Sequence, residues 1–448
     1  MCSSGQVFAK RNIAAKPRNQ IVSQTYNNIA SWHVPALILL YVLLIPLGES
    51  SLAVMLFFAL GGIFLLFRDG KQLYAQYRDW IYMTLALSIP IAVALFTAIR
   101  FDKTLISFLI FILHGFSGIY VFHWCKKYWR PYFILYGIVA ILVFWMATAL
   151  PNLIHGNLLM LWQEWIGELT GYYSSNRNPG ALLAHFSPLY FEALYRASLK
   201  LKNRLPWLLI IPYLLVIFLA GNRTGWMIIS LVTIIFFIRL ILIHHFTLRS
   251  TLFVTGLAAI TLLVSFHTFP HFEQRLNRSL GAFQGTPQAI DQASAGRLQI
   301  WQGGLPLVQD SLFHPIGTHA FGQIGYEKGY HSREWGYAHI YWMDVVVSTG
   351  LLGLVLYLGV FMYLAHKLFA SLSRNNFSFA MLLLAFALLL PINPNWEFYA
   401  PRVASLIWFT LILGFTYAYM DSNIGQSLNR PEDSSARAGR SGSQVDPV

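Results

Sequence analysis

Charged residues are scarce in this chain of 448 residues: they make up 11% of the sequence, while hydrophobic residues make up 56%. Soluble domains carry about 25% charged residues, so the composition excludes an ordinary soluble domain and is typical of a protein with many membrane spans. The formal net charge is +13, but the basic residues lie in short clusters between apolar runs. Because they form no basic groove with interleaved aromatic residues, we expect no nucleic-acid partner.

Cysteines, nucleotide motifs and outer carboxylate pairs are rare or missing as well. The two cysteines, Cys2 and Cys125, have no metal-ligand spacing and form no disulfide framework. The sequence has no phosphate-binding loop ending in Gly-Lys-Ser or Gly-Lys-Thr. Its outer segments have no aspartate pair suited to a divalent cation. We therefore expect no cofactor and no metal site. The polar N-terminal stretch also lacks the apolar core and cleavage site of a signal peptide.

Long apolar runs fill most of the chain. A spanning helix needs about 20 mostly apolar residues, and about 17 are tolerated. On this criterion we predict an all-α polytopic integral membrane protein with about 12 transmembrane helices. The predicted spans are 33–48, 51–67, 81–99, 104–124, 131–150, 179–196, 205–221, 226–243, 250–268, 339–365, 377–391 and 403–420. In the sixth span, Glu192 and Arg196 are four residues apart, a spacing that favours an ion pair within one helix.

The distribution of Lys and Arg predicts the orientation of these spans. With a cytosolic N-terminus, the inner segments include "RDGKQLYAQYRD", "CKKYWR" and "RASLKLKNR", and they hold most of the basic residues. Cytoplasmic loops carry such an excess. We therefore expect both termini in the cytosol and the chain surrounded by membrane lipids. The short outer loops hold few basic residues, namely Arg100, Lys103, Arg177, Arg223 and Arg402.

Two outer segments are long. Residues 151–178 contain "LLMLWQEWIGEL", an amphipathic pattern that predicts a helix lying on the outer interface. Residues 269–338 predict a large helical periplasmic loop between the ninth and tenth spans, and loops of this length are often functional. The expected organisation is an N-terminal cytosolic tail (1–32), nine spans (33–268), the periplasmic loop (269–338), three spans (339–420) and a disordered cytosolic tail (421–448).

Three ionisable residues stand out at the outer boundary: Arg223 in "LAGNRTGW", Arg297 in "AGRLQIW" and His339 in "YAHIYW". Charges at the edge of a span are costly and often mark functional sites. Each residue also has an ordinary alternative. Arg223 is also explained by snorkelling to lipid phosphate, Arg297 by simple exposure, and His339 by a structural hydrogen bond.

The neighbours of Arg297 and His339 predict local structure. Leu298, Trp301, Leu305 and Val308 recur at helical spacing, which predicts an amphipathic helix over 297–309 with Arg297 in its first turn. His339, Val346, Gly350 and Gly353 share one face of an ideal helix. The two glycines on that face predict a groove below the histidine, which a helix or lipid chain can approach. His271, His314, His319 and His331 show no ligand spacing and are interpreted as solvent-exposed or packing residues.

Two arginines and a histidine at a membrane surface suit one class of chemistry. Arginine presents a planar fork that matches phosphate oxygens, and a near-neutral histidine takes a proton from a hydroxyl. Such a set favours attack by a hydroxyl on a carbon whose leaving group is a phosphate or diphosphate. The arginines would stabilise the charge that develops on the leaving group.

These features together resemble the superfamily of O-antigen ligases and O-antigen polymerases. The resemblance rests on "NRTGW", "GRLQIW", and a histidine followed by glycines eleven and fourteen residues later (His339, Gly350, Gly353), and it covers about residues 205–365. It implies a fold similar to the GT-C class of glycosyltransferases. It also implies a metal-independent enzyme, with Arg223 and Arg297 on the donor diphosphate and His339 as the base.

The resemblance also implies the substrates and leaves the acceptor open. The donor is a glycan linked to undecaprenyl diphosphate at the periplasmic face, and a ligase transfers it to a lipid A-core sugar. An O-antigen polymerase, or a transferase that glycosylates pilin or another protein, is the alternative. A non-enzymatic transporter is a further one. Asp344, Arg402 and Arg275 are secondary site candidates. One departure concerns Ile340, because the family often has Asn at this position.

Overall fold

The structure is a computed structural model, and it describes residues 18–149, 179–243, 248–331 and 335–428. In these ranges every regular element is a helix. The α-helices are α1 (Arg18–Leu44), α2 (Leu52–Ala94), α3 (Phe101–Lys127), α4 (Pro131–Ala149), α6 (Pro179–Leu201), α7 (Ile210–Leu219), α8 (Arg223–Leu242), α9 (Leu248–Thr268), α10 (Pro270–Leu280), α11 (Pro287–Ala293), α12 (Arg297–Ser311), α13 (Phe321–Glu327), α14 (Tyr341–Ala370), α15 (Ser378–Leu388) and α16 (Pro401–Leu428).

Each predicted apolar run contains helical residues, but fewer than twelve helices are long enough to cross a membrane unaided. In the described ranges six helices are long and apolar enough to cross a membrane, or seven if α9 and the helix after it form one bent span. The first candidate, Ser31–Ala94, has 64 residues. A straight helix of that length would be about three times as long as the hydrocarbon core is thick. Breaks at Gly48, Asp69 and Tyr77 divide it, and these breaks separate the first three predicted spans.

Several boundaries differ from those predicted. Helix α1 begins at Arg18, well before the first predicted span at 33, and α16 continues to Leu428. The predicted interfacial helix at 151–178 lies outside the described residues, as does most of the predicted C-terminal tail. The predicted loop at 269–338 is helical, as expected, because α10 to α13 lie in it.

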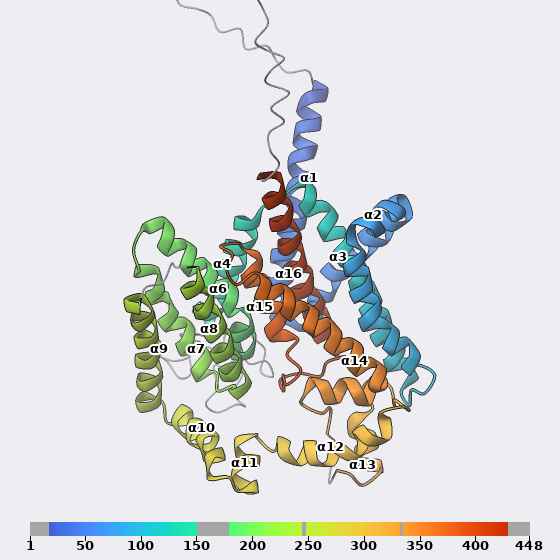
Figure 1. Cartoon of the computed structure of the whole chain (residues 1–448), viewed down its shortest axis with the longest axis vertical. Coiled ribbons are helices and arrows are strands. Elements are labelled where there is room, and N and C mark those ends of the chain that lie inside the picture. The colour runs from blue at the N-terminus through green and yellow to red at the C-terminus, as the bar shows by residue number, and fades with distance from the viewer. Residues whose placement is uncertain (1–17, 150–178, 244–247, 332–334, 429–448) are drawn as a thin grey trace, which may run out of the picture.

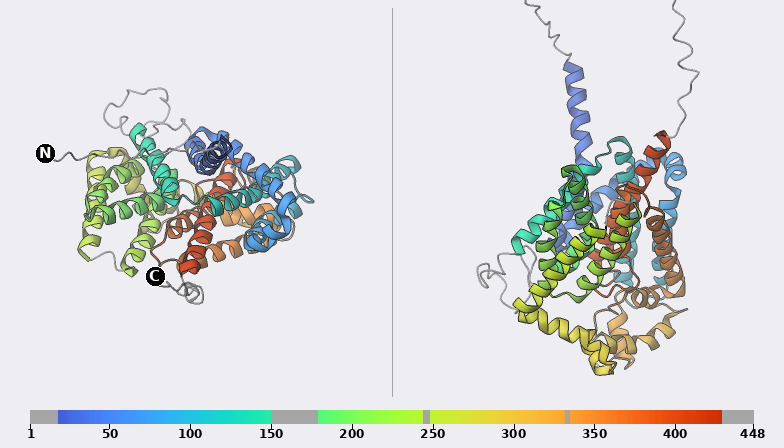
Figure 2. Two further views of the ribbon diagram at one scale, coloured as in Figure 1. Left: turned by 90° about the horizontal axis from the view of Figure 1, so that it is seen from above. Right: turned by 60° about the vertical axis from the view of Figure 1, so that its left-hand side comes forward.

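The two ends of the described chain lie at the same end of the helical bundle. Figure 1 shows the start of α1 and the end of α16 at the top, and α10 to α13 as a layer at the bottom. A second view, in the right half of Figure 2, shows the same layer below the bundle. We call the end with α10 to α13 the loop face and the opposite end the terminal face.

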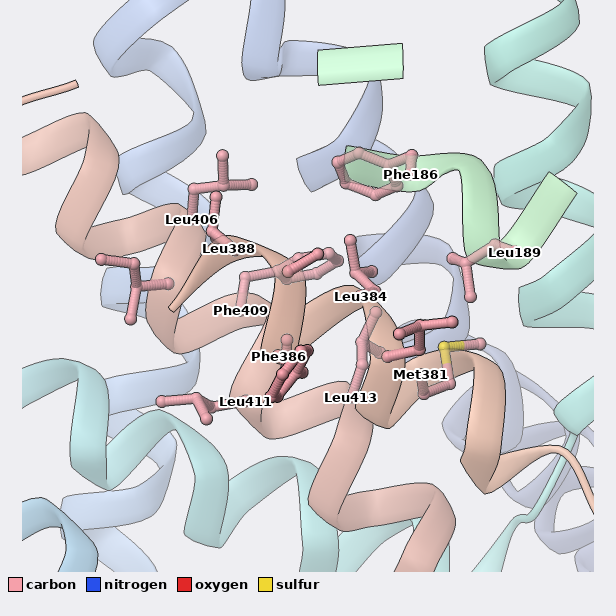
Figure 3. Packing of buried hydrophobic residues seen from close by; sticks show 14 of the residues in the cluster. Phe186, Leu189, Met381, Leu384, Phe386, Leu388, Leu406, Phe409, Leu411 and Leu413 are labelled. Atoms are coloured by element: carbon pink, nitrogen blue, oxygen red, sulfur yellow. The ribbon is translucent and has the colours of Figure 1, made fainter. Parts of the chain in front are cut away.

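The core of the bundle is centred on α15, in which all residues are buried. Figure 3 shows Phe186 and Leu189 of α6 and Leu413 of α16 packed around Met381 and Leu384 of α15. Helix α15 therefore lies between α6 and α16, and contacts no solvent or lipid along its length.

Helix α15 is too short to complete a crossing. Its 11 residues rise about 16 Å, roughly half of a 30 Å hydrocarbon core. The chain continues from α15 as irregular backbone through 389–400, which we call the 389–400 segment. Irregular backbone at membrane depth is tolerated only where protein buries it or where it lines a cavity. This segment leads toward the loop face, where it contacts the candidate site.

Helix α14 is interrupted at Gly350, whose backbone has φ 72° and ψ −171°. Leu351 donates its N–H to the Leu312 carbonyl at 2.8 Å, and Ile316 donates to the Val347 carbonyl at 3.1 Å. The residues after α12, 312–317, therefore dock against the break by main-chain hydrogen bonds. The predicted helical face through His339 is wrong, because α14 begins only at Tyr341. The close approach predicted at the two glycines is observed: residues 312–317 fill the space at Gly350, and Pro90 of α2 lies against Gly353.

The predicted ion pair in α6 is confirmed and belongs to a larger buried network. Arg196 Nε lies 2.7 Å from one Glu192 oxygen, and Arg239 Nη1 lies 2.7 Å from the other. Both Glu192 and Arg239 are fully buried. Arg239 also donates to the carbonyls of Arg374 and Asn376, at 3.3 and 2.8 Å. The network joins α6 and α8 to the turn between α14 and α15.

Candidate active site

Arg223 is the first residue of α8, at the loop face. Asn222 caps the helix by accepting the Gly225 N–H at 2.8 Å, which fixes where the helix begins. The guanidinium of Arg223 donates from Nη1 to the carbonyls of Gln292 and Ala293, at 2.8 and 2.7 Å. These carbonyls lie at the end of α11, so Arg223 connects the bundle to the layer of α10 to α13.

Positive charge accumulates around Arg223. Among the described residues, the charged groups that act on it are three other arginines, Arg275, Arg278 and Arg297. Arg275 is anchored by a hydrogen bond from Nη1 to the Gly221 carbonyl at 2.7 Å. Because like charges repel one another, a bound anion would be stabilised among these four arginines. The predicted pair Arg223 and Arg297 is thus part of one electropositive cluster, and the secondary candidate Arg275 belongs to it.

Arg297 begins α12, as the sequence predicts, after Gly296 in the left-handed conformation. The buried face of the helix differs from the prediction. Leu305 is 50% exposed, whereas the buried positions are Ile300, Gly304, Leu307 and Ser311. The small residues explain the rotation, because Gly304 allows Met343 and Phe321 to approach closely. Burial lowers the pKa of Arg297, although an arginine remains protonated at neutral pH.

Helix α12 is joined to the backbone beside His339. Trp301, one turn after Arg297, donates its indole N–H to the Ala338 carbonyl at 3.2 Å. This bond brings Arg297 within electrostatic range of His339. The two residues are 42 positions apart in the sequence, and the structure places both at the loop face.

His339 lies in irregular backbone just before α14, with φ 54°. A non-glycine residue with this φ is strained, and such strain clusters at active sites. The carboxylate of Asp344 holds the conformation: Oδ1 accepts the Ala338 N–H at 2.9 Å, and Oδ2 accepts the Phe398 N–H at 3.4 Å. The secondary candidate Asp344 therefore supports the backbone on either side of the histidine, and the hydrogen bonds of the described residues do not join it to the imidazole.

The contacts of the His339 ring define its tautomer. Nδ1 lies 3.4 Å from the Pro394 carbonyl oxygen. A carbonyl can only accept, so Nδ1 carries the hydrogen and Nε2 presents a lone pair when the ring is neutral. Burial, followed by the positive charge of Arg297, lowers the pKa of His339 to about 4. The imidazole is therefore neutral at pH 7 and can accept a proton at Nε2.

Tyr337 completes the wall around this histidine. Its ring packs on the His339 ring with centroids 3.9 Å apart, and its hydroxyl donates to the Asn395 carbonyl at 3.1 Å. Burial raises the pKa of Tyr337, and Arg297 and Arg402 oppose this rise with their charge. The secondary candidate Arg402 is therefore close enough for its charge to act on Tyr337.

The 389–400 segment is the part of the site that the sequence interpretation missed. Asn395 Oδ1 accepts from Asn222 beside Arg223 at 3.2 Å, and Asn393 donates to His185 of α6 at 3.1 Å. Glu397 lies 2.6 Å from His319 Nδ1. The interpretation of His319 as a solvent or packing residue is wrong for this reason. A signal was present: "PINPNWEFYAP" has three prolines within eleven residues, a composition that rules out a continuous helix there.

The structure thus gathers all six sequence candidates at the loop face. Arg223, Arg275 and Arg297 form the electropositive cluster, His339 is supported by Asp344, and Arg402 acts on the neighbouring tyrosine. In the described ranges, no three His, Cys, Asp or Glu side chains are grouped so that they could hold a metal ion. A nucleophile is not part of this set, which agrees with chemistry in which the substrate supplies the attacking hydroxyl.

Comparison with known proteins identifies a family domain around this site. Residues 208–358 match the family model described as O-Antigen ligase. This match confirms the resemblance predicted from the sequence. It includes Arg223, Arg297 and His339 as well as Gly350 and Gly353. A search of curated proteins found no match.

Proposed function

We propose that this multi-pass membrane protein, whose residues 208–358 match the O-antigen ligase family model, transfers a glycan from undecaprenyl diphosphate to a lipid A-core sugar. The family match supports a glycan transferase. The observation that carries the finer proposal is the cluster of four arginines beside a neutral, oriented histidine. Such a cluster suits a diphosphate leaving group, and such a histidine suits a hydroxyl nucleophile.

The proposed reaction is a single displacement. The donor diphosphate lies against Arg223 and Arg297, and the acceptor hydroxyl lies near Nε2 of His339. As the hydroxyl oxygen forms a bond to the anomeric carbon, its proton passes to Nε2. The bond between that carbon and the diphosphate oxygen breaks, and the electron pair leaves with the lipid diphosphate. The arginines stabilise the negative charge that develops on the leaving oxygen. No metal step is needed in this scheme.

Donor binding would also activate the base. In the free protein the charge of Arg297 contributes to the low pKa of His339. A bound diphosphate offsets that charge, and a nearby anion favours the protonated imidazole. The pKa of His339 therefore rises toward neutrality when the donor is present, where a general base is most effective.

We further propose that the loop face is periplasmic and the terminal face cytosolic, in the inner membrane of a bacterium. The Lys- and Arg-rich connections lie toward the terminal face, where both ends of the described chain lie, as the positive-inside rule requires. Under this proposal each of the twelve apolar segments makes one crossing, with α7 and α15 as short helices completed by irregular backbone, in a GT-C-like arrangement. An even number of crossings agrees with both described ends lying at one face (Figure 1).

The first test is the banding pattern of lipopolysaccharide from a host strain that lacks this gene. Rescue with the wild-type protein should restore a ladder on the core, and His339→Ala should leave bare core. His314→Ala is the matched control, because His314 is an exposed histidine of the same outer layer. Core carrying a single repeat in the His339→Ala strain would instead identify a polymerase. A ladder that never depends on the gene would refute ligation and direct attention to protein acceptors.

Arg297→Lys tests the diphosphate role. The variant keeps the charge and loses the planar fork, so we expect a large loss of transfer with normal protein levels. Arg68→Lys is the control, because Arg68 is half exposed and pairs with Asp69 on a distant element. Near-normal transfer by Arg297→Lys would exclude a bidentate contact at this position.

A further inference from the structure

A cleft of about 1460 Å³ opens far from the candidate active site. Its walls come from the interrupted middle of α2, the end of α14, the turn at 371–377 and the end of α16. These parts of the elements lie toward the terminal face (Figure 1), whereas His339 lies at the loop face. The cleft therefore has no part in the transfer reaction proposed above.

The acidic side chains that line this cleft have partners within the protein. Asp79 lies 3.6 Å from Arg78 and accepts a hydrogen bond from Tyr363 at 2.9 Å. Asp421 accepts the Ser378 N–H at 3.0 Å, at the start of α15. The acidic groups of the cleft are thus occupied by partners within the protein.

Within the part of the chain that the structure describes, two cations of the cleft have no carboxylate partner. Lys367 makes a cation–π contact with the Tyr363 ring at 5.1 Å, and Arg374 contributes its carbonyl to Arg239 while its side chain is exposed. Among the described residues, no carboxylate forms an ion pair with either side chain. Lys367 lies in the last turn of α14, Arg374 lies in the turn that follows this helix, and both line the same cleft. They leave an uncompensated positive charge there.

Aromatic side chains make up much of the remaining wall. They include Trp129, Tyr132, Phe377, Phe415 and Tyr419. Tyrosine and tryptophan are enriched where lipid headgroups meet the hydrocarbon region, because one end of the ring is apolar and the other is polar. A ligand that fits both the open cations and this wall has an anionic head and an apolar body.

We propose that this cleft binds an anionic phospholipid of the leaflet at the terminal face, with Lys367 and Arg374 contacting the headgroup phosphate. Basic pockets between membrane helices bind anionic headgroups, and each basic residue near the surface strengthens such binding. The acyl chains leave between the aromatic side chains and reach the bilayer. A soluble phosphate would satisfy the two cations but would leave the apolar wall without a partner.

The test measures lipid binding to the full-length protein by native mass spectrometry. The purified protein is titrated with phosphatidylglycerol, and with phosphatidylcholine of the same chain length. The Lys367→Gln/Arg374→Gln variant should bind phosphatidylglycerol about 30-fold more weakly than wild type, with no change for phosphatidylcholine. Lys71→Gln/Lys200→Gln is the control. It removes the same charge from exposed residues outside the cleft and should bind like the wild type.

Two further measurements keep the proposal open to refutation if the double variant folds poorly. In the wild type, salt should weaken the binding of phosphatidylglycerol, because the contact is electrostatic. Inorganic phosphate at millimolar concentration should not displace the lipid, and displacement would show a soluble-anion site instead. Equal loss in both double variants, or equal binding of the two lipids by the wild type, would overturn the proposal.

Discussion

Asp344 Oδ1 accepts the backbone N–H of Ala338 at 2.9 Å. This hydrogen bond joins the residues on either side of His339, whose backbone has a positive φ of 54°. The other oxygen of the same carboxylate accepts the N–H of Phe398 at 3.4 Å. One side chain thus fixes the residue before the histidine and the segment whose Pro394 carbonyl faces Nδ1. The orientation of the proposed base depends on a carboxylate that does not touch it.

Asp344→Asn should therefore impair transfer without removing a reacting group. The amide replaces one of the two carboxyl oxygens by an NH2 group, so one of the two buried N–H groups loses its acceptor at a cost of about 1–3 kcal/mol. We expect kcat/KM to fall about 10- to 100-fold while donor affinity is retained. Asp310→Asn is the control, because Asp310 is a half-exposed carboxylate of α12. Loss of donor affinity equal to the loss of rate would contradict a positioning role.

The protonation of His339 gives a prediction that needs no enzyme assay. Its pKa is lowered to about 4 by burial and by the charge of Arg297. Only the neutral imidazole reacts with diethyl pyrocarbonate, so modification of His339, read by peptide mass spectrometry, should titrate well below pH 6. In Arg297→Gln the midpoint should move upward. Exposed His314 in the same sample serves as the internal control. An unchanged midpoint would show that the charge of Arg297 does not reach the ring.

The same pKa predicts how stability depends on pH. The folded protein binds the His339 proton more weakly than the unfolded chain does. The contribution of this group to stability is therefore complete above its unfolded value near 6.5, and it is lost as the pH falls toward about 4. As the pH is lowered between these values, the melting temperature should fall less steeply for His339→Gln than for the wild type. Parallel curves for the two proteins would contradict the lowered pKa.

Gly350→Ala should loosen the junction between α14 and the residues after α12. An alanine there must adopt φ 72°, and its Cβ would lie 3.0 Å from the Leu312 carbonyl oxygen. This combination of φ 72° and ψ −171° is essentially restricted to glycine, and it costs another residue about 1–3 kcal/mol. We expect a lower melting temperature and faster proteolysis around 312–317. Gly359→Ala in the same helix meets no atom within 4 Å and should leave the protein as stable or slightly more stable.

Arg239→Met should destabilise the protein more than Arg196→Met. Arg239 is fully buried against Glu192, while Arg196 keeps 14% of its side chain exposed. Removing one partner of a buried ion pair costs about 3–5 kcal/mol, because an uncompensated charge remains. Thermal unfolding in detergent compares the two variants directly. A larger effect at Arg196 would show that the α6 pair, and not the link to α8, stabilises this network.

The sequence predicts those features that depend on neighbours along the chain. Apolar runs predict where helices form, and the spacing of apolar residues after Arg297 predicts a helix with this arginine in its first turn. The four-residue spacing of Glu192 and Arg196 predicts their ion pair. The electropositive character of the loop face is also predictable, because two boundary arginines belong to it.

Features set by distant contacts were not predictable in the same way. The partner of Glu192 across the bundle, Arg239, is 47 residues away. The left-handed backbone of His339 depends on Asp344, so an ideal-helix face through this histidine could not be correct. Glu397 meets His319 only because α15 stops halfway, and no local pattern measures where a buried helix will end.

The shortness of α15 bears on how the protein is assembled. A segment of 11 apolar residues is shorter than the roughly 17 that a single helix needs to remain in a bilayer. On leaving the insertion machinery, α15 would expose the polar backbone of 389–400 to lipid. We therefore expect α15 and α16 to enter the membrane together as a hairpin, after α6 is in place to receive them. A chain truncated within α16 should then fail to retain α15, and maturation of the active site would be the last step of biogenesis.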